Sequence, residues 1–96
     1  MKIAAAAIRY RLKAEPDVER YVQGPNHAYC IDWFASAGIY QRDRVDGDTS
    51  GFMTDAGDFV DRKTAYEIAE RAGQLKCHRE DRTLYSEFVN YKIDKI

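Results

Sequence analysis

Residues 52–73 have the sequence Phe52-Met53-Thr54-Asp55-Ala56-Gly57-Asp58-Phe59-Val60-Asp61-Arg62-Lys63-Thr64-Ala65-Tyr66-Glu67-Ile68-Ala69-Glu70-Arg71-Ala72-Gly73. Two short apolar segments, 52–54 and 58–60, flank Asp55-Ala56-Gly57, which predicts a hairpin with a positive φ at Gly57. Asp61 predicts the N-cap of a helix over about 62–72, and Gly73 fits the position just after its C-terminus. The apolar residues of this helix share one face: Ala65, Ile68, Ala69 and Ala72.

The residues before this stretch predict two more strands and a second helix. Residues 2–13 alternate, which is typical of a strand with one buried face, here Ala4, Ala6, Ile8, Tyr10 and Leu12. Residues 14–17 predict a turn and residues 18–23 a second strand, so the two strands form a hairpin. Asn26 predicts the N-cap of a helix over about 27–37, with a core-facing stripe of Cys30, Trp33, Phe34 and Ala37.

The remaining segments carry weaker signals. Residues 39–45 fit a strand or a loop, residues 46–51 and 74–83 fit polar loops, and alternation within 84–96 allows a closing strand. The predicted fold class is therefore α+β. A small antiparallel sheet, made of the N-terminal hairpin and a short hairpin near 52–60, packs with two helices at about 27–37 and 62–72.

Composition limits the class of protein. The 96 residues predict a single domain, 1–96, and 15 Lys plus Arg against 16 Asp plus Glu give a net charge of -1. The balanced charge gives no positive electrostatic field that would attract nucleic acid. No apolar run approaches the ~20 residues that span a bilayer. Two cysteines are too few for a disulfide framework, so we expect free thiols and a cytoplasmic protein, with a Cys30–Cys77 bridge as the alternative.

Candidate chemistry centres on cations and aromatic rings. Arg9 and Arg11 share a strand face beside small alanines, which fits an anion site or a solvated sheet edge. Arg62 lies in the first turn of the second helix, where free N–H groups favour phosphate, although Asp61 fits a simple cap equally well. The twelve aromatic residues fit either stacking on a nucleobase or core packing.

Catalytic and metal motifs are weak. His27, Cys30, Cys77 and His78 could be assembled into a zinc site, but neighbouring residues seldom ligate one tetrahedral ion together. The sequence has no glycine-rich phosphate loop or nucleophile elbow, and its carboxylates show no acid–base pair. We therefore expect a protein that is not an enzyme and that needs no metal or cofactor.

A composite motif resembles a known family. Gly-Phe-x-Thr-x-x-Gly-x-Phe-Val-x-Arg occupies 51–62, an Ala-x-x-Ile-Ala helix ends in Ala-Gly-Gln at 74, and Leu-x-Ser-Glu occupies 84–87. Together with Ala-Ala-Ile-Arg-Tyr at 6–10, this pattern resembles the Thoeris anti-defence one family of phage sponge proteins. That family sequesters cyclic ADP-ribose isomers, and its members are also linked to cyclic oligonucleotide signals. The chain departs from it at Asn26, where an arginine is expected, and at Thr64, where an acidic residue is expected.

The resemblance implies a phage protein that binds a cyclic nucleotide alarm signal in the host cytoplasm without cleaving it. It also implies a homo-oligomer, either a dimer or a hexamer built from dimers, with no membrane and no stable nucleic-acid partner. The implied ligand-binding residues are Arg9, Arg11, His27, Phe52, Asp61, Arg62, Gln74 and Glu87.

Two other functions stay open. The first is inhibition of a host defence protein by direct contact, through the acidic residues Asp43, Asp46, Asp48, Asp55, Asp58 and Asp61. Solvated turn residues are the simpler interpretation of that set. The second is an enzyme that degrades the signal.

Overall fold

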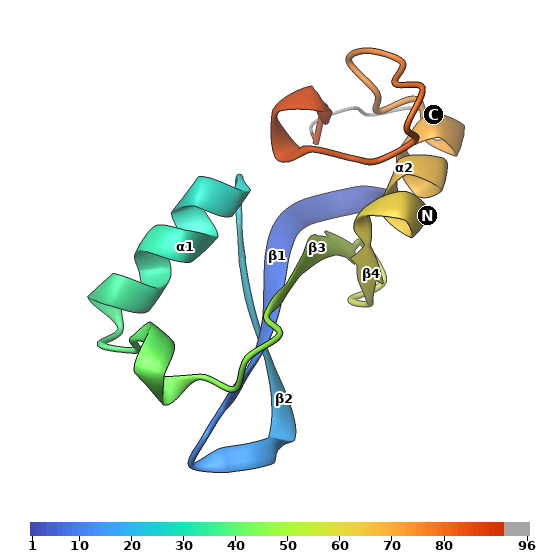
Figure 1. Ribbon diagram of the computed structural model, residues 1–96. Coiled ribbons are helices and arrows are strands. Elements are labelled where there is room, and N and C mark those ends of the chain that lie inside the picture. The colour runs from blue at the N-terminus through green and yellow to red at the C-terminus, as the bar shows by residue number, and fades with distance from the viewer. Residues whose placement is uncertain (92–96) are drawn as a thin grey trace.

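The computed structural model describes residues 1–91 and has an α+β fold, as predicted (Figure 1). Strands β1 (Ile3–Leu12), β2 (Glu15–Gly24), β3 (Thr49–Thr54) and β4 (Phe59–Asp61) form one antiparallel sheet in the order β2-β1-β3-β4. Helix α1 (His27–Ser36) follows β2, and helix α2 (Arg62–Arg71) follows β4. Short 3-10 turns occupy Gln41–Asp43 (η1) and Ser86–Phe88 (η2).

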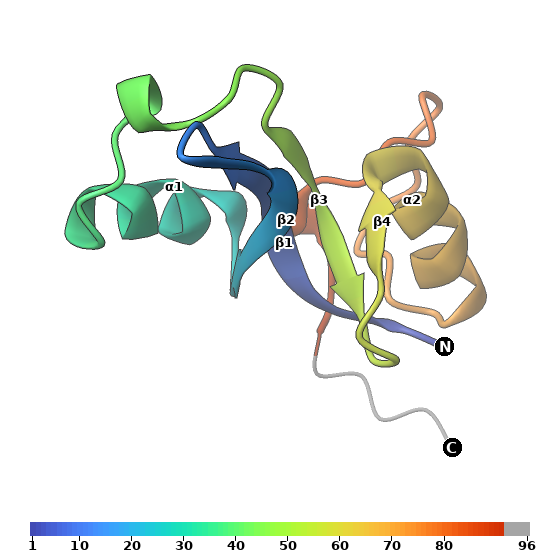
Figure 2. The ribbon, with the colours of Figure 1, turned by 90° about the horizontal axis from the view of Figure 1, so that it is seen from below.

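Both helices pack on one face of the twisted sheet, α1 on β2 and β1 and α2 on β3 and β4. They lie far apart, to the left and right of the strands in Figure 2. Ala6, Ile8 and Tyr10 alternate along β1 and therefore point to one face. Around Ala6 lies the α2 core: Ile3, Ala6, Phe52, Ala65, Tyr66, Ala69, Leu84 and Val89. Around Ile8 and Tyr10 lies the α1 core: Ile8, Tyr10, Val22, Cys30 and Phe34. β1 is thus the strand that carries both cores.

The two predicted helix caps and the predicted turn at Gly57 are confirmed. The side chain of Asn26 accepts a hydrogen bond from the Tyr29 N–H at 2.8 Å, and that of Asp61 accepts one from the Thr64 N–H at 2.7 Å. Both residues therefore cap the helices that they precede. Gly57 has a φ of +87° in the turn between β3 and β4, where a side chain would be strained.

The ends of the strands differ from the prediction. β2 begins at Glu15, not at residue 18, because Leu12 pairs with Glu15 and the turn is shorter than expected. Pro16 is tolerated there because β2 is an edge strand. β3 begins at Thr49, inside the predicted polar loop, because Thr49 pairs with Arg9. A register shift between Ile3 and Ala5 places Ile3 in the core and leaves Ala4 exposed, which reverses the predicted alternation there.

The structure also shows what the segments with weak sequence signals form. Residues 39–45 contain η1 and an isolated bridge from Arg44 to Leu12. The predicted closing strand is wrong for residues 84–91, which form η2 and a single bridge from Val89 to Leu75. Residues 92–96 of that prediction lie outside the described residues. Within the predicted stripe of α1, Cys30 and Phe34 are buried, Trp33 is half-buried and Ala37 is exposed. Within residues 1–91 no helix is long and apolar enough to cross a bilayer.

Candidate functional site

A cavity of about 550 Å³ lies where the N-terminus of α1 meets the first residue of α2 and the segment around η2. Its wall combines two cations, a carboxylate, an imidazole and two phenol rings, contributed by Arg62, Lys76, Glu87, His27, Tyr85 and Tyr91. The volume falls within the usual range for small-molecule sites, roughly 300–1,000 Å³. Segments far apart in the sequence therefore line one cavity with a polar and aromatic wall.

Arg62 supplies a positive charge with no carboxylate partner within residues 1–91. Its Nη1 donates to the Leu84 carbonyl oxygen at 2.8 Å, and its Nε and Nη2 donate to the Ser50 hydroxyl at 3.3 and 3.2 Å. A guanidinium carries five N–H groups, so these three bonds leave two for another acceptor. The side chain is held in place and keeps hydrogen-bonding capacity for an anion.

His27 joins α1 to β3 and to η2. Its Nε2 lies 2.7 Å from the Gly51 carbonyl oxygen, and its backbone N–H donates to the Ser86 hydroxyl at 3.4 Å. The ring contacts that of Phe52 edge to face, with 5.0 Å between centroids. Burial lowers the pKa of His27, the bond to Gly51 partly offsets that effect, and the charge on Arg62 lowers the pKa further. The imidazole is therefore neutral near pH 7 and adds polarity without charge.

Tyr85 connects the cavity to the loop after α2. The guanidinium carbon of Arg62 lies 5.2 Å from the centroid of the Tyr85 ring, and that of Arg79 lies 4.6 Å from it. Such cation–π contacts contribute about 0.5–1 kcal/mol each at exposed sites. Arg79 is also paired with Asp81, whereas Arg62 has no acidic partner among residues 1–91. The ring thus fixes the orientation of the unpaired cation.

The tyrosine at the end of the described chain has an unusual hydroxyl. The Tyr91 oxygen is buried and has no hydrogen-bond partner within residues 1–91. Burial raises the pKa of Tyr91 to about 12, so the group stays protonated and can act as a donor. An unpaired buried hydroxyl costs about 1–3 kcal/mol. A bound molecule that reached this oxygen would recover part of that cost.

The structure brings together three of the residues that the sequence proposes for binding. His27, Arg62 and Glu87 all line the cavity. Arg9 and Arg11 do not, because they lie on the sheet face opposite the helices. There they share a separate hollow of about 120 Å³ with Glu19 and the loop before β3. The Arg9 guanidinium lies 5.2 Å from the Phe59 ring centroid, and Arg11 donates to the Pro16 carbonyl.

The other three proposed residues have structural roles near the cavity. Phe52 is fully buried beneath the His27 ring, and Asp61 caps α2. Hydrogen bonding to Thr64 lowers the pKa of Asp61, as expected for a capping carboxylate. Gln74 is fully buried, and its amide bonds both backbone groups of Ile3. None of the three lines the 550 Å³ cavity.

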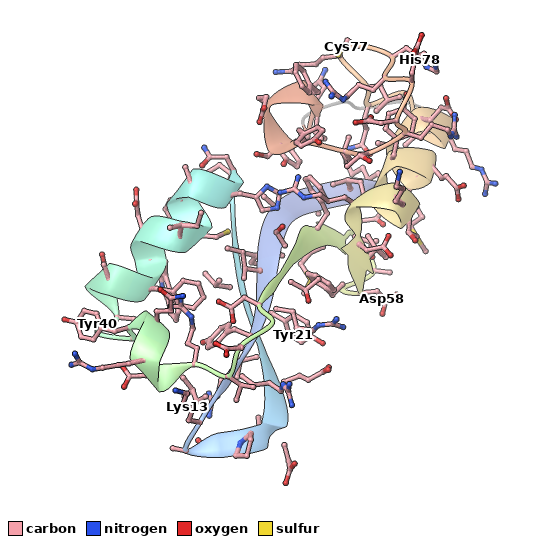
Figure 3. The ribbon with its side chains drawn as sticks, viewed as in Figure 1. Lys13, Tyr21, Tyr40, Asp58, Cys77 and His78 are labelled. Carbon is pink, nitrogen blue, oxygen red and sulfur yellow. The ribbon has the colours of Figure 1, made fainter. Side chains whose placement is uncertain are left out.

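The alternative sites find less support in the geometry. Cys30 and Cys77 are free thiols, one buried and one exposed, and Cys77 lies with His78 in the loop beyond α2 (Figure 3). Within residues 1–91 no three side chains of metal-ligating type gather. Four of the six aspartates proposed for partner contact already accept hydrogen bonds within the protein: Asp43, Asp48, Asp55 and Asp61.

Sequence reasoning missed two residues that line this cavity, Lys76 and Tyr91. Lys76 falls in a stretch without periodicity, and the hydrogen bond from its N–H to the Phe88 carbonyl oxygen, next to the Leu75–Val89 bridge, brings it to η2. Asn26 also lines the cavity, and the sequence marked it both as a helix cap and as the position where the resembled family has an arginine. The Leu84-x-Ser86-Glu87 motif was the one available signal for this region, and Ser86 and Glu87 both line the cavity.

One comparison with known proteins gives a match. A family model described as phage T4 y16D protein matches residues 2–89. No curated protein and no solved structure matches the chain. The family match covers both cores and every charged residue of the cavity.

Proposed function

The chain belongs to the phage T4 y16D protein family and is thus a phage protein, and from that premise we propose that it binds and sequesters a cyclic nucleotide signal of its host without cleaving it. The observation that carries the proposal is the unpaired guanidinium of Arg62 in the 550 Å³ cavity. A cyclic ADP-ribose isomer is the first candidate ligand, and cyclic oligonucleotides are the second.

Charge in the cavity favours a phosphorylated ligand. Arg62 and Lys76 contribute two positive charges, Glu87 contributes one negative charge, and His27 is neutral near pH 7. Charge-assisted hydrogen bonds from guanidinium to phosphate are about twice as strong as neutral ones. The N–H groups that Arg62 has left supply such bonds.

The remaining lining groups suit the sugar and the base. The Glu87 carboxylate can accept hydrogen bonds from ribose hydroxyls. The oxygen of the Asn26 side chain caps α1, and within residues 1–91 its amide N–H groups keep their capacity to donate. Tyr85 and Tyr91 add aromatic side chains to the wall, against which a heterocycle can pack. The Gly51–Glu87 pattern that resembles the sponge family thus contributes Arg62, Tyr85 and Glu87 to one place.

The experiment is incubation, capture and release. Purified protein is mixed with cyclic ADP-ribose isomers and with cyclic di- and trinucleotides, washed on a filter and heated, and the released molecule is identified by mass spectrometry. Recovery of an unchanged nucleotide supports sequestration. Recovery of an altered product contradicts it in favour of an enzyme, and retention of no nucleotide contradicts nucleotide binding itself.

Two variants test whether the captured ligand binds in the 550 Å³ cavity. Arg62→Gln removes the charge at the junction of α2 and η2, and we expect at least a tenfold loss of affinity, since a hydrogen bond to a charged group contributes about 1.5–3 kcal/mol. Arg42→Gln is the matched control, because Arg42 is exposed and contacts only the Tyr40 ring among the interactions of residues 1–91. Equal affinities of the two variants would place the ligand elsewhere.

We also propose that the protein acts in the host cytoplasm as a homo-oligomer, a dimer or a hexamer built from dimers. Support comes from the sheet face opposite the helices, where the half-exposed Tyr21 ring lies 5.5 Å from that of Phe59. No helix covers this face within residues 1–91. Native mass spectrometry of Tyr21→Lys should show dissociation to monomer, whereas Tyr40→Lys, at an exposed ring beside η1, should not.

A further inference from the structure

A second cavity of about 400 Å³ lies on the same side of the sheet, between α1 and the segment around η1. Its wall is largely apolar and includes Ile8, Ile31, Phe34 and Ile39, with Tyr40 near η1 (Figure 3). The polar part of the wall comes from Gln41, Ser50 and the ion pair of Arg44 with Asp48. An apolar wall with a few polar edge groups suits a planar heterocycle better than a phosphate.

One hydrogen-bonded pair links a residue that lines the first cavity to a residue that lines the second. Arg62 lines the first cavity, Ser50 lines the second, and Nε and Nη2 of Arg62 donate to the Ser50 hydroxyl at 3.3 and 3.2 Å. The next residue along β3, Gly51, accepts the hydrogen bond of His27. The guanidinium of Arg62 therefore lines the first cavity and is bonded to a residue of the second.

Charge is divided unequally between the cavities. Arg44 is the cation that lines the second one, and it is already paired with Asp48 at 2.9 Å, with its guanidinium carbon 4.0 Å from the Phe34 ring centroid. Among residues 1–91, no other cation lines this cavity. A phosphate is consequently favoured at Arg62 and disfavoured deeper in the apolar hollow, where it would lose hydration without a free positive partner.

We propose that the two cavities are the halves of one binding site for a cyclic dinucleotide. A phosphate lies against Arg62, one nucleoside occupies the cavity lined by Glu87 and Tyr91, and the second base lies against Ile31 and Phe34. This inference rests on the proposed function and narrows it, because a mononucleotide fills only one half. The first half supplies the charged contacts, and the second half distinguishes ligands by the presence of a second base.

The test compares matched ligands by isothermal titration calorimetry. Cyclic di-AMP and cyclic di-GMP are compared with 3′,5′-cyclic AMP and 3′,5′-cyclic GMP on the full chain. The unaltered protein should bind one of the dinucleotides at least tenfold more tightly than its mononucleotide. Ala35→Trp fills the second cavity from the exposed side of α1 and should abolish that difference. Ala37→Trp, exposed just after α1 and outside both cavities, should preserve it.

Each outcome separates the two proposals. Equal affinity for mono- and dinucleotides, with no effect of Ala35→Trp, would overturn the two-part site and leave nucleotide binding standing. A dinucleotide preference that survives Ala35→Trp would also overturn it, because the second cavity would then be unused. Failure of all four nucleotides to bind would overturn the two-part site, and the capture experiment with cyclic ADP-ribose isomers would then decide the proposed function. Far-UV circular dichroism of the two tryptophan variants checks that both are folded.

Discussion

The side chain of Gln74 bonds both backbone groups of Ile3 and thereby replaces a strand partner at the start of β1. Its Oε1 accepts from the Ile3 N–H at 2.8 Å, and its Nε2 donates to the Ile3 carbonyl at 2.7 Å. The pair is separated by 71 positions in sequence, and Gln74 is fully buried. The amide is therefore part of the fold that holds the cavity and is not open to a ligand.

We predict that Gln74→Ala lowers the free energy of unfolding by about 3 kcal/mol or more, because two buried backbone groups lose their partners at about 1–3 kcal/mol each. Urea denaturation measures the change. Gln74→Glu should also destabilise, since it sets a carboxylate oxygen against the Ile3 carbonyl. The control is Gln23→Ala at an exposed position of β2, with an expected change below about 0.5 kcal/mol. A similar loss in both alanine variants would contradict the role of Gln74.

Stability should fall as the pH drops below about 6.5, the ordinary pKa of histidine. The pKa of His27 is lowered in the folded state by burial, so the unfolded chain takes up a proton first. The contribution of neutral His27 is present above pH 6.5 and is lost as the pH falls through the folded pKa. Thermal unfolding between pH 8 and 5 measures this slope, and His27→Gln should flatten it. An unchanged slope in the variant would assign the effect to other groups.

Removal of the α2 cap should cost about 1 kcal/mol. Asp61→Ala deletes the oxygen that accepts the Thr64 N–H, whereas Asp58→Ala removes a nearby exposed carboxylate with no side-chain hydrogen bond within residues 1–91. Denaturant midpoints of the two variants give the comparison. Because the pKa of Asp61 is lowered, its contribution should be present above pH 4 and decline as the pH falls through the folded pKa. Equal effects of both substitutions would argue against capping.

The two thiols should react at very different rates. Cys77 is exposed, whereas Cys30 is fully buried with its Sγ near the Ala6 and Val22 carbonyl oxygens, and burial raises the pKa of the Cys30 thiol. A chromogenic disulfide reagent should titrate one thiol in the native protein and two after denaturation. Cys77→Ser should remove the fast reaction. Rapid modification of Cys30 in that variant would show that the α1 core opens readily.

Local chemistry explains which parts of the fold the sequence predicts correctly. Asn26, Asp61 and Gly57 act on neighbours within four residues, so their caps and turn are visible in the sequence alone. The start of β3 depends instead on Thr49 facing Arg9, forty residues earlier, and the order of the strands depends on such pairs. Long-range pairing leaves no local signal, and residues 49–51 therefore resemble a polar loop.

The candidate site likewise combines residues that the sequence indicates with residues that only tertiary packing brings in. Arg62 and Glu87 could be proposed because they belong to a recognisable motif. Lys76 lines the cavity because backbone contacts hold it beside η2. Arg9 does not line it, because alternation along β1 turns its side chain to the other face of the sheet. Gln74 has a residue type that suits ligand binding, but burial gives it a structural task. Residue type indicated which side chains could bind a ligand, and tertiary packing decided which of them lie together in one cavity.

The division of the core along β1 sets an order for folding during synthesis. Every residue of the α1 core, including the half-buried Trp33 and Ile39 beside it, lies within the first 39 positions. The α2 core needs residues from Ile3 to Val89. The α1 half can therefore form while the ribosome is still adding the second half, and β1 then offers its free edge and the Ile3 end to β3 and α2 as they emerge. The first half of the chain can thus bury its apolar residues before the last residues are made.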